Sequence, residues 1–199
     1  MASLSVVCLN HGNYLSRGDE YVYRLRAGVE KHLKASHTFR VFTEADIPEG
    51  VTGWWGKIAL FRDGMLPDGE RVIFFDLDTI ITGSLDDMAA YRGPLAMLSD
   101  FHFPWQHASG VMLWEAGKYH HIWQAWDDAG RPEMRQGDQM WIRFMKPQAP
   151  MLQKLFPGQI VGLKTQCQGR LPEGARVCCY HGQPKPHEND WLPYLEKMT

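Results

Sequence analysis

Short apolar blocks alternate along the chain with segments whose apolar residues recur at helical spacing. The first block runs from Leu4 to Leu9 without helical periodicity, which is typical of a strand buried on both faces. The next segment has apolar residues three or four positions apart, which predicts an amphipathic helix capped by Ser16 or Asp19. The repeating positions of this helix are Val22, Leu25, Val29 and Leu33.

The alternation of strands and helices continues to the end of the chain. The most apolar strand is Arg71–Phe75, and it ends on Asp76. Further strands are predicted at residues 38–43, 94–98, 110–114, 160–163 and 176–180, and helices at 54–61, 119–129 and 138–145. This order predicts an α/β fold, a Rossmann-like single domain over residues 1–199, with a mainly parallel central sheet flanked by helices on both faces. In such a fold the ligand crevice lies outside the carboxyl ends of the strands.

Composition and charge narrow the class of protein. Hydrophobic residues make up 44% and charged residues 22% of the chain, which is ordinary globular composition, and no apolar run is long enough to span a bilayer. Residues 1–5 have no basic flank, so we read them as the start of a strand rather than a signal peptide and expect a soluble, cytoplasmic protein. A net charge of -2 with scattered basic residues argues against a nucleic-acid partner.

The four cysteines do not form a recognisable framework. Cys8 lies in the first strand, and the neighbours Cys178 and Cys179 point to opposite strand faces, so we expect no disulfide network. Cys167, Cys178 and His181 offer zinc-ligand chemistry, but no pair has the CxxC spacing of a zinc site. Buried structural cysteines are the preferred interpretation.

Asp76 and Asp78, separated by Leu77, follow the most apolar strand at the point where a crevice is expected. Two close carboxylates repel one another unless a divalent cation lies between them, and such a cation also binds the oxygens of a diphosphate. The alternative is structural: one carboxylate caps the turn at residues 79–81 and the other is solvated.

The segment FFDLDTIITGSLD resembles the metal-binding strand of nucleotide-sugar glycosyltransferases with the GT-A fold, the family 8-like group that contains glycogenin and bacterial lipopolysaccharide galactosyltransferases. In that group an apolar pair and a turn lead to an acidic residue, an order matched here by Ile80, Ile81, Gly83 and Asp86. The resemblance implies an enzyme that moves a sugar from a nucleotide-diphosphate donor, with UDP as the expected nucleotide. It also implies retention of the anomeric configuration.

Upstream, the segment WWGKI resembles the part of the family that places a basic residue near the donor phosphates, and Lys57 is the matching residue. The alternative for Lys57 is a solvated lysine on an amphipathic helix. Downstream, the segment SGVML resembles a family strand that borders the donor sugar, and Gly110 there allows close backbone approach or forms a bulge. Ala108 replaces the family's asparagine, so the identity of the sugar does not transfer.

Asp138 and Gln139 resemble the family's Asp-Gln pair beside the reacting carbon, although Asp138 also suits a helix N-cap. Asp100 closes a strand and is a weaker candidate for binding sugar hydroxyls. Asn10 and Tyr14 follow the first strand, where the family holds the nucleotide base, and Tyr14 suits stacking on uracil.

The segment CYHGQPKPH resembles the last family signature. The match implies that His181 completes the metal shell with Asp76 and Asp78, and that Lys185 contacts the diphosphate, although the loop is shorter here than in several relatives. Leu77 and Gly182 are further candidates for binding the donor. Imidazole with carboxylates suits Mn²⁺, and Mg²⁺ is the alternative. His187 is interpreted as a surface histidine.

The acceptor is not named by the sequence and is expected to be a glycan, a lipid-linked sugar or a protein. Aromatic and histidine side chains between residues 101 and 107 suit an acceptor wall or a lid. Two other functions stay open. One is a phosphatase of the haloacid dehalogenase type, whose pattern expects threonine or valine where this chain has Ile80. The other is a non-catalytic module that binds a nucleotide sugar.

Overall fold

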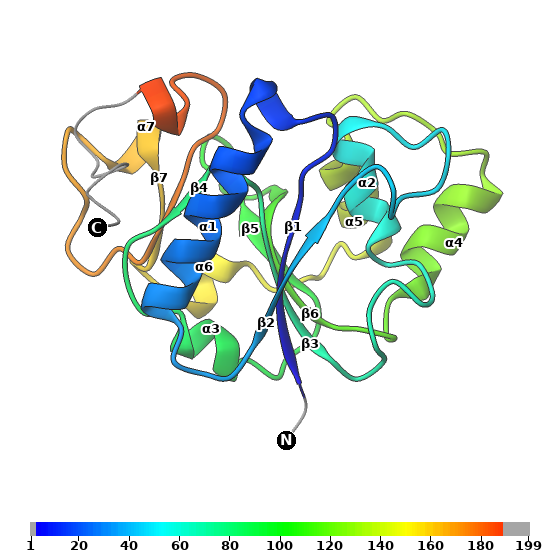
Figure 1. The fold of residues 1–199 in the computed structure, drawn as a ribbon, viewed down its shortest axis with the longest axis horizontal. Coiled ribbons are helices and arrows are strands. Elements are labelled where there is room, and N and C mark those ends of the chain that lie inside the picture. Colours follow the sequence, from blue (N-terminus) through cyan, green and yellow to red (C-terminus); the bar gives the residue numbers. More distant parts are fainter. Residues whose placement is uncertain (1–2, 189–199) are drawn as a thin grey trace.

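In the computed structural model, which describes residues 3–188, five strands form a central sheet (Figure 1). They are β1 (Leu4–Leu9), β2 (Thr38–Phe42), β3 (Arg71–Phe75), β5 (Ala96–Ser99) and β6 (His107–Glu115). Their order is β2-β1-β3-β6-β5. β1 is parallel to both neighbours, whereas β6 is antiparallel to both β3 and β5. The predicted α/β fold with a mainly parallel sheet is confirmed, and β6 is the strand whose reversal the sequence pattern does not indicate.

A second sheet lies beside the first. It contains β4 (Thr79–Ile81), β7 (Ile160–Gly162) and β8 (Val177–Cys179), in the order β4-β8-β7. β8 runs antiparallel to β4 and parallel to β7. Because β3 belongs to the first sheet and β4 to the second, the chain passes between the two sheets through Asp76, Leu77 and Asp78.

The helices cover both faces of the central sheet (Figure 1). The α-helices are α1 (Gly18–His32), α2 (Gly56–Ala59), α3 (Asp86–Ala90), α4 (His120–Asp128), α5 (Asp138–Met145), α6 (Leu152–Leu155) and α7 (Leu163–Gln166). Three short 3-10 turns are η1 (Tyr14–Ser16), η2 (Gly53–Trp55) and η3 (Pro186–Glu188). Within residues 3–188, none of the helices has the length and apolar character that a bilayer crossing requires.

Two helix predictions need correction. α1 begins at Gly18 with Arg17 at the N-cap, and neither Ser16, which has a φ of 58° in the preceding turn, nor Asp19 caps it. Asn13 Oδ1 instead accepts from the N–H of Gly18 at 2.8 Å. Asp19 lies in the first turn, where its charge still favours the helix N-terminus. The helix predicted at 54–61 is divided into η2 and the single turn α2. By contrast, α5 has the predicted bounds.

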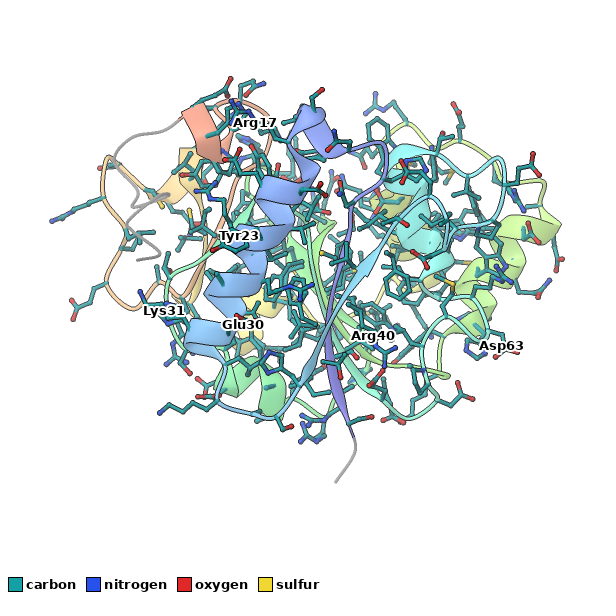
Figure 2. The ribbon with its side chains drawn as sticks, viewed as in Figure 1. Arg17, Tyr23, Glu30, Lys31, Arg40 and Asp63 are labelled. Atoms are coloured by element: carbon teal, nitrogen blue, oxygen red, sulfur yellow. The ribbon has the colours of Figure 1, made fainter. Side chains whose placement is uncertain are left out.

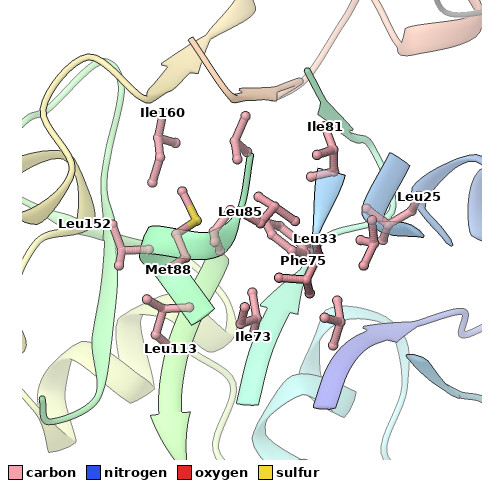
Figure 3. Packing of buried hydrophobic residues seen from close by; sticks show 14 of the residues in the cluster. Leu25, Leu33, Ile73, Phe75, Ile81, Leu85, Met88, Leu113, Leu152 and Ile160 are labelled. Atoms are coloured by element: carbon pink, nitrogen blue, oxygen red, sulfur yellow. The ribbon is translucent and has the colours of Figure 1, made fainter. Parts of the chain in front are cut away.

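Alternating side chains of the central strands build a core on each face. In β3, Ile73 and Phe75 join the cluster that packs against α1, α3, α6 and the second sheet (Figure 3). Val72 and Phe74 point to the opposite face and join the cluster beneath α2, α4 and α5. The central sheet therefore separates two layers of helices, and each layer has its own hydrophobic core.

α1 lies close to the second sheet. A Cβ atom at Gly28 would be 3.0 Å from the Cβ of Ile81 in β4, so glycine at this position lets the helix approach the strand. Tyr23, Glu30 and Lys31 lie on the exposed part of the same helix (Figure 2).

We predict that Gly28→Ala lowers the stability of the protein. Alanine favours a helix over glycine by about 1 kcal/mol, but overpacking against the β-carbon of Ile81 costs more, so we expect a net loss of about 1 kcal/mol in urea unfolding. Glu30→Ala and Glu30→Gly, at an exposed position of the same helix, measure the propensity difference alone. A Gly28→Ala variant stabilised by that same difference would show that the close contact is absent.

Candidate functional site

A cavity of about 460 Å³ opens at the carboxyl ends of β3 and β5, within the size range of ligand pockets. One wall comes from η2, α2 and the start of α5, and the other from the second sheet and the loop after β5. Eight of the donor-site, metal and catalytic candidates line it: Lys57, Asp76, Asp78, Asp100, Gly110, Asp138, Gln139 and His181. Phe101, from the segment suggested as an acceptor wall, lines it as well.

The backbone between the two sheets fixes the acidic pair. The N–H of Asp76 donates to the carbonyl of Gly110 at 2.8 Å, and the N–H of Thr79 donates to the carbonyl of Asp76 at 3.1 Å. The N–H of Tyr180 in turn donates to the carbonyl of Asp78 at 3.2 Å. The Leu77 side chain is buried in the core, while both carboxylates line the cavity. Leu77 is thus available to a ligand only through its backbone.

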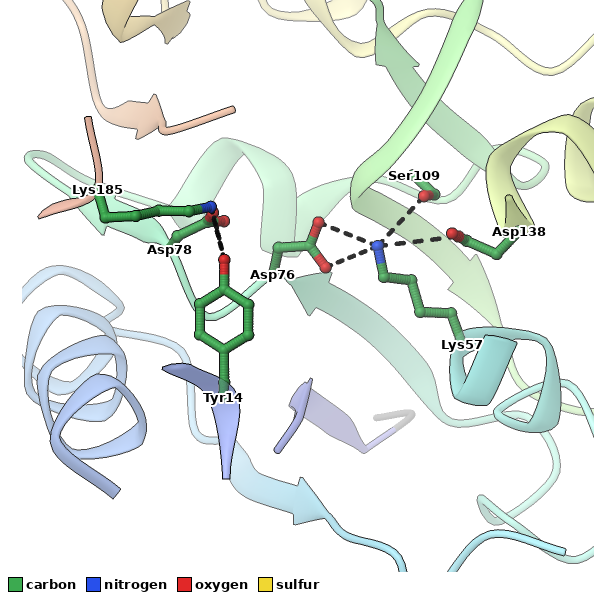
Figure 4. Close-up of polar contacts among 7 residues, drawn as sticks. All are labelled: Tyr14, Lys57, Asp76, Asp78, Ser109, Asp138 and Lys185. Atoms are coloured by element: carbon green, nitrogen blue, oxygen red, sulfur yellow. Dashed lines mark hydrogen bonds and ion pairs between the residues drawn. The ribbon is translucent and has the colours of Figure 1, made fainter. Parts of the chain in front are cut away.

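Lys57 lies among three polar side chains (Figure 4). Its Nζ is 2.8 Å from Asp76 Oδ1, 3.8 Å from Asp138 Oδ2 and 3.3 Å from Ser109 Oγ. The Lys57 side chain is only 10% exposed. Burial alone would lower the pKa of this lysine, but the carboxylates of Asp138 and Asp76 raise its pKa above the ordinary value. Lys57 is therefore a charged residue held in place, not a solvated surface lysine.

Burial and the charge of Lys57 shift the pKa values of Asp76 and Asp138 in opposite directions. Burial raises the pKa of Asp76, the charge of Lys57 works against that rise, and Asp78 adds to it. Burial likewise raises the pKa of Asp138, and Lys57 again opposes the change. Asp138 is the first residue of α5 and Gly137, with a φ of 67°, is its N-cap, so the predicted capping role of Asp138 is wrong. Its carboxylate faces Lys57 instead.

Gly110 provides room for the acidic pair. A Cβ atom at this position would lie 3.2 Å from Asp76 Oδ2, so a side chain here would press on that carboxylate. The pairing register of β5 with β6 also shifts between Met97 and Leu98, opposite this part of β6. Close approach and strand irregularity thus occur together at the SGVML segment.

Asp78 forms an ion pair with a second lysine, Lys185 (Figure 4). The Nζ of Lys185 lies 2.5 Å from Asp78 Oδ2 and donates to the hydroxyl oxygen of Tyr14 at 2.6 Å. The Tyr14 hydroxyl donates to the same carboxylate oxygen at 2.9 Å. Burial and the charge of Asp78 raise the pKa of Tyr14. Although Tyr14 and Lys185 do not line the cavity, both hold one of its carboxylates.

His181 lines the cavity from the end of β8. Its ring stacks on Phe101 at a centroid distance of 5.2 Å, and its Nε2 is 3.1 Å from Nε2 of His102. Its Nδ1 is buried without a hydrogen-bond partner among residues 3–188. Burial, His102 and Lys164 lower the pKa of His181, which favours the neutral imidazole, the form that binds metals.

The donor types fit a divalent metal, but they do not converge on one point in this structure. Two carboxylates and an imidazole with a free nitrogen line the same cavity, a set that suits Mn²⁺. In the described part of the chain, the one group of three whose ligand atoms lie within 4.8 Å of one another is Asp63, Asp68 and His120. That group is largely exposed and is not part of the cavity.

Asn10 and Gly182 lie outside the cavity lining. The amide oxygen of Asn10 accepts from the N–H of Tyr14 at 3.3 Å, and its amide nitrogen donates to Asp19 at 3.4 Å, so Asn10 ties the end of β1 to α1. Gly182 is exposed with a φ of 69°, and a Cβ atom there would lie 3.0 Å from the Nζ of Lys164.

The loop after β5 is organised by Asp100, whose Oδ1 accepts from the N–H groups of His102 and Phe103 at 2.8 and 2.9 Å. Phe103 and Trp105 are exposed, whereas His107 is buried with its Nε2 hydrogen-bonded to a backbone carbonyl. The suggested acceptor wall therefore does not include His107.

Sequence reasoning assigned no role to Trp54, Ser109 and Arg135, all of which line the cavity. Trp54 and Ser109 belong to segments that were singled out, but their direction depends on the turn η2 and on the irregular part of β6. No local pattern around Arg135 indicates that it reaches the site.

We predict that Lys57→Met lowers the free energy of unfolding by roughly 2–4 kcal/mol, close to the loss expected when one partner of a buried ion pair is removed. Two carboxylates would then share a low-dielectric site without a cation. Urea unfolding without divalent ions measures the effect. The double variant Lys57→Met/Asp138→Asn should recover part of the loss, and Lys118→Met, at an exposed ion pair, should change stability little. Equal effects of the Lys57 and Lys118 variants would contradict this electrostatic role.

Comparison with known proteins agrees with this architecture. No protein-family model matches the sequence, and no curated protein matches it. Among solved structures, the chain is similar to the glycosyltransferase GlyE of Streptococcus pneumoniae TIGR4, with 17% identity, a TM-score of 0.70 and coverage of 96% of this chain and 60% of that one. It is also similar to the galactosyltransferase LgtC in complex with donor and acceptor sugar analogs, with 14% identity, a TM-score of 0.60 and coverage of 92% and 88%. The bifunctional glycosyltransferase WbbM gives 9% identity, a TM-score of 0.69 and coverage of 93% and 47%. The chain thus spans about 60% of the GlyE chain that it matches, and it has the GT-A-type fold of these glycosyltransferases.

Proposed function

We propose that this chain is a glycosyltransferase that moves a sugar from a UDP-sugar to an acceptor with the help of a divalent metal, Mn²⁺ before Mg²⁺. The observation that supports the proposal best is the acidic pair at the exit of β3, in which Asp76 and Asp78 line one cavity and each contacts its own lysine. The proposed domain covers residues 1–199, of which 1–2 and 189–199 lie outside the described residues.

The charges in Figure 4 favour an additional cation. Among the residues in Figure 4, the carboxylates of Asp76, Asp78 and Asp138 are paired with two ammonium groups, those of Lys57 and Lys185. A metal held by Asp76, Asp78 and His181 would supply neutralisation of the diphosphate leaving group. The position of Lys185 against Asp78 supports this assignment, because it shows that a positive charge is stable against that carboxylate.

The two lysines have different roles in the proposal. Lys57 is fixed between Asp76 and Asp138, so it orients these carboxylates and lowers the negative potential that a diphosphate would meet. Lys185 lies in a loop beside η3 and contacts Asp78 from outside the cavity lining. When a metal and a nucleotide bind, Lys185 is free to exchange Asp78 for the diphosphate.

Asp138 and Gln139 are the groups proposed beside the reacting carbon. Asp138 Oδ2 is buried, has no hydrogen-bond partner among residues 3–188 and lies 3.8 Å from the Lys57 ammonium, so a ligand reaches this acceptor only if the carboxylate turns toward the cavity. A carboxylate in this position can stabilise positive charge on a sugar, in line with a retaining reaction. The proposal also assigns Tyr14 and Asn10 to the nucleotide base and Gly182 to the donor, although these residues lie outside the cavity lining.

The first test is the metal dependence of UDP binding. We expect isothermal titration to show at least roughly ten-fold tighter UDP binding with Mn²⁺ than without it, because hydrogen bonds and ligands to charged oxygens are strong. Asp78→Asn should remove that difference, and Asp128→Asn, an exposed aspartate on α4, should keep it. Equal, metal-independent affinity in the wild type and in Asp78→Asn would overturn the metal assignment.

Turnover separates the proposed function from its alternatives. Release of UDP from a panel of UDP-sugars supports a transferase, and release of phosphate from sugar phosphates would support a phosphatase instead. Metal-dependent UDP binding without any release would support a non-catalytic module.

The second test concerns Lys185. Because its ammonium holds Asp78 without ligand, we expect Lys185→Ala to bind Mn²⁺ alone about three-fold more tightly, as measured by electron paramagnetic resonance. The same variant should bind UDP in the presence of Mn²⁺ roughly ten-fold more weakly, since a charge-assisted contact to the diphosphate is lost. Lys154→Ala, at an exposed lysine on α6, is the matched control. Parallel changes of both affinities would contradict the proposed exchange.

A further inference from the structure

The cavity wall formed by η2, α2 and the start of α5 carries side chains that have no role in the proposed donor site. Diphosphate and metal are assigned to Asp76, Asp78, His181 and Lys185, while the start of α5 and the turn before α2 contribute other lining groups. Of these, Trp54 is 61% exposed although it is a large apolar side chain. Arg135 is exposed on the same lining.

Trp54 is positioned by its contact with the loop before α5. A Cβ atom at Gly137 would lie 2.7 Å from the indole Nε1 of Trp54, so the ring lies directly against the backbone of that glycine. A fixed and exposed aromatic face beside a polar cavity suits stacking on a sugar ring.

Arg135 is held at the cavity by a turn. The N–H of Gly137 donates to the carbonyl of Met134 at 2.9 Å, which places Arg135 within the turn. The next residue, Gln136, accepts from the guanidinium of Arg143 at 3.0 Å. The backbone around Arg135 is therefore fixed on both sides.

The guanidinium of Arg135 has no ion pair or hydrogen bond within residues 3–188, which distinguishes it from its neighbours. Arg131 pairs with Asp127 at 2.7 Å, and Arg143 donates to Gln106 at 2.9 Å. The lysines near the cavity are likewise occupied, Lys57 by Asp76 and Lys185 by Asp78. In the described part of the site, Arg135 is thus the cation whose charge is not yet matched.

We propose that the acceptor is a sugar bearing an anionic group, a carboxylate or a phosphate, which Arg135 binds while Trp54 stacks on the ring. This rests on the proposed function, since it takes the lining around Asp76, Asp78, Asp138 and Gln139 as the donor site. The planar guanidinium forms paired hydrogen bonds with either anion, and a neutral sugar leaves it unpaired. Arg135 is therefore a specificity-determining residue for the acceptor.

The test compares sugars that differ only at C6. Glucose with glucuronic acid and glucose 6-phosphate, and galactose with galacturonic acid and galactose 6-phosphate, are titrated against the protein saturated with UDP and Mn²⁺. Ligand-observed NMR gives each dissociation constant. We expect an acidic member of at least one set to bind roughly ten-fold more tightly than its neutral parent. The uronic acid and the phosphate ester distinguish the two sources of negative charge.

Three variants test which side chain causes the preference for the acidic sugar. Arg135→Ala should abolish the preference for the acid and leave UDP affinity unchanged, whereas Arg62→Ala, at an exposed arginine outside the cavity, should keep the preference. Trp54→Ala should weaken neutral and acidic members alike. Equal or absent binding of the acids, or loss of UDP affinity in Arg135→Ala with the preference intact, would overturn the proposal. Failure of UDP to bind the wild type would instead contradict the proposed function.

Discussion

The buried ammonium group of Lys57 connects the elements that meet at the carboxyl end of β3. Lys57 comes from the single turn α2, yet its Nζ reaches Asp76 at the end of β3, Asp138 at the start of α5 and Ser109 in β6. Removing these charges from water is costly unless they neutralise one another, so the four side chains are stable only as a group. These contacts join α2 and α5 of one helix layer to β3 and β6 of the sheet.

The acidic pair is structural as well as chemical. Asp76 ends a strand of the first sheet and Asp78 precedes a strand of the second, and backbone hydrogen bonds from Thr79 and Tyr180 fix the passage between them. The two carboxylates therefore cannot move independently of the two sheets. Their lysines differ in this respect, since Lys57 is enclosed by regular structure and Lys185 approaches from a loop. Under the proposed function, Lys57 stays in place and Lys185 exchanges its partner.

The sequence predicts the elements better than their connections. Periodicity alone identifies β1, β3 and α5, because each has an uninterrupted apolar pattern that local sterics and burial determine. It misses the short strand β4, the reversed direction of β6 and the start of α1, because these depend on pairing partners distant in the chain. For the site, the resemblance singled out eight residues that line the cavity. It did not indicate that Lys57 would pair with Asp76 or Lys185 with Asp78, because partners 19 and 107 positions apart leave no local pattern.

The hydrogen-bonding capacity left in the cavity bears on which sugar it can recognise. Ala108 offers no side-chain hydrogen bond, and the Ser109 hydroxyl already accepts from Lys57. One oxygen of Asp100 is occupied by the loop that it organises. Among the described lining residues, Asp138 Oδ2 has no hydrogen-bond partner but is buried, and the Gln139 side chain makes no hydrogen bond. Under the proposed function, few polar side chains are then available to form hydrogen bonds with the donor sugar. Discrimination between sugars therefore depends more on the shape of the cavity than on a dense hydrogen-bond network.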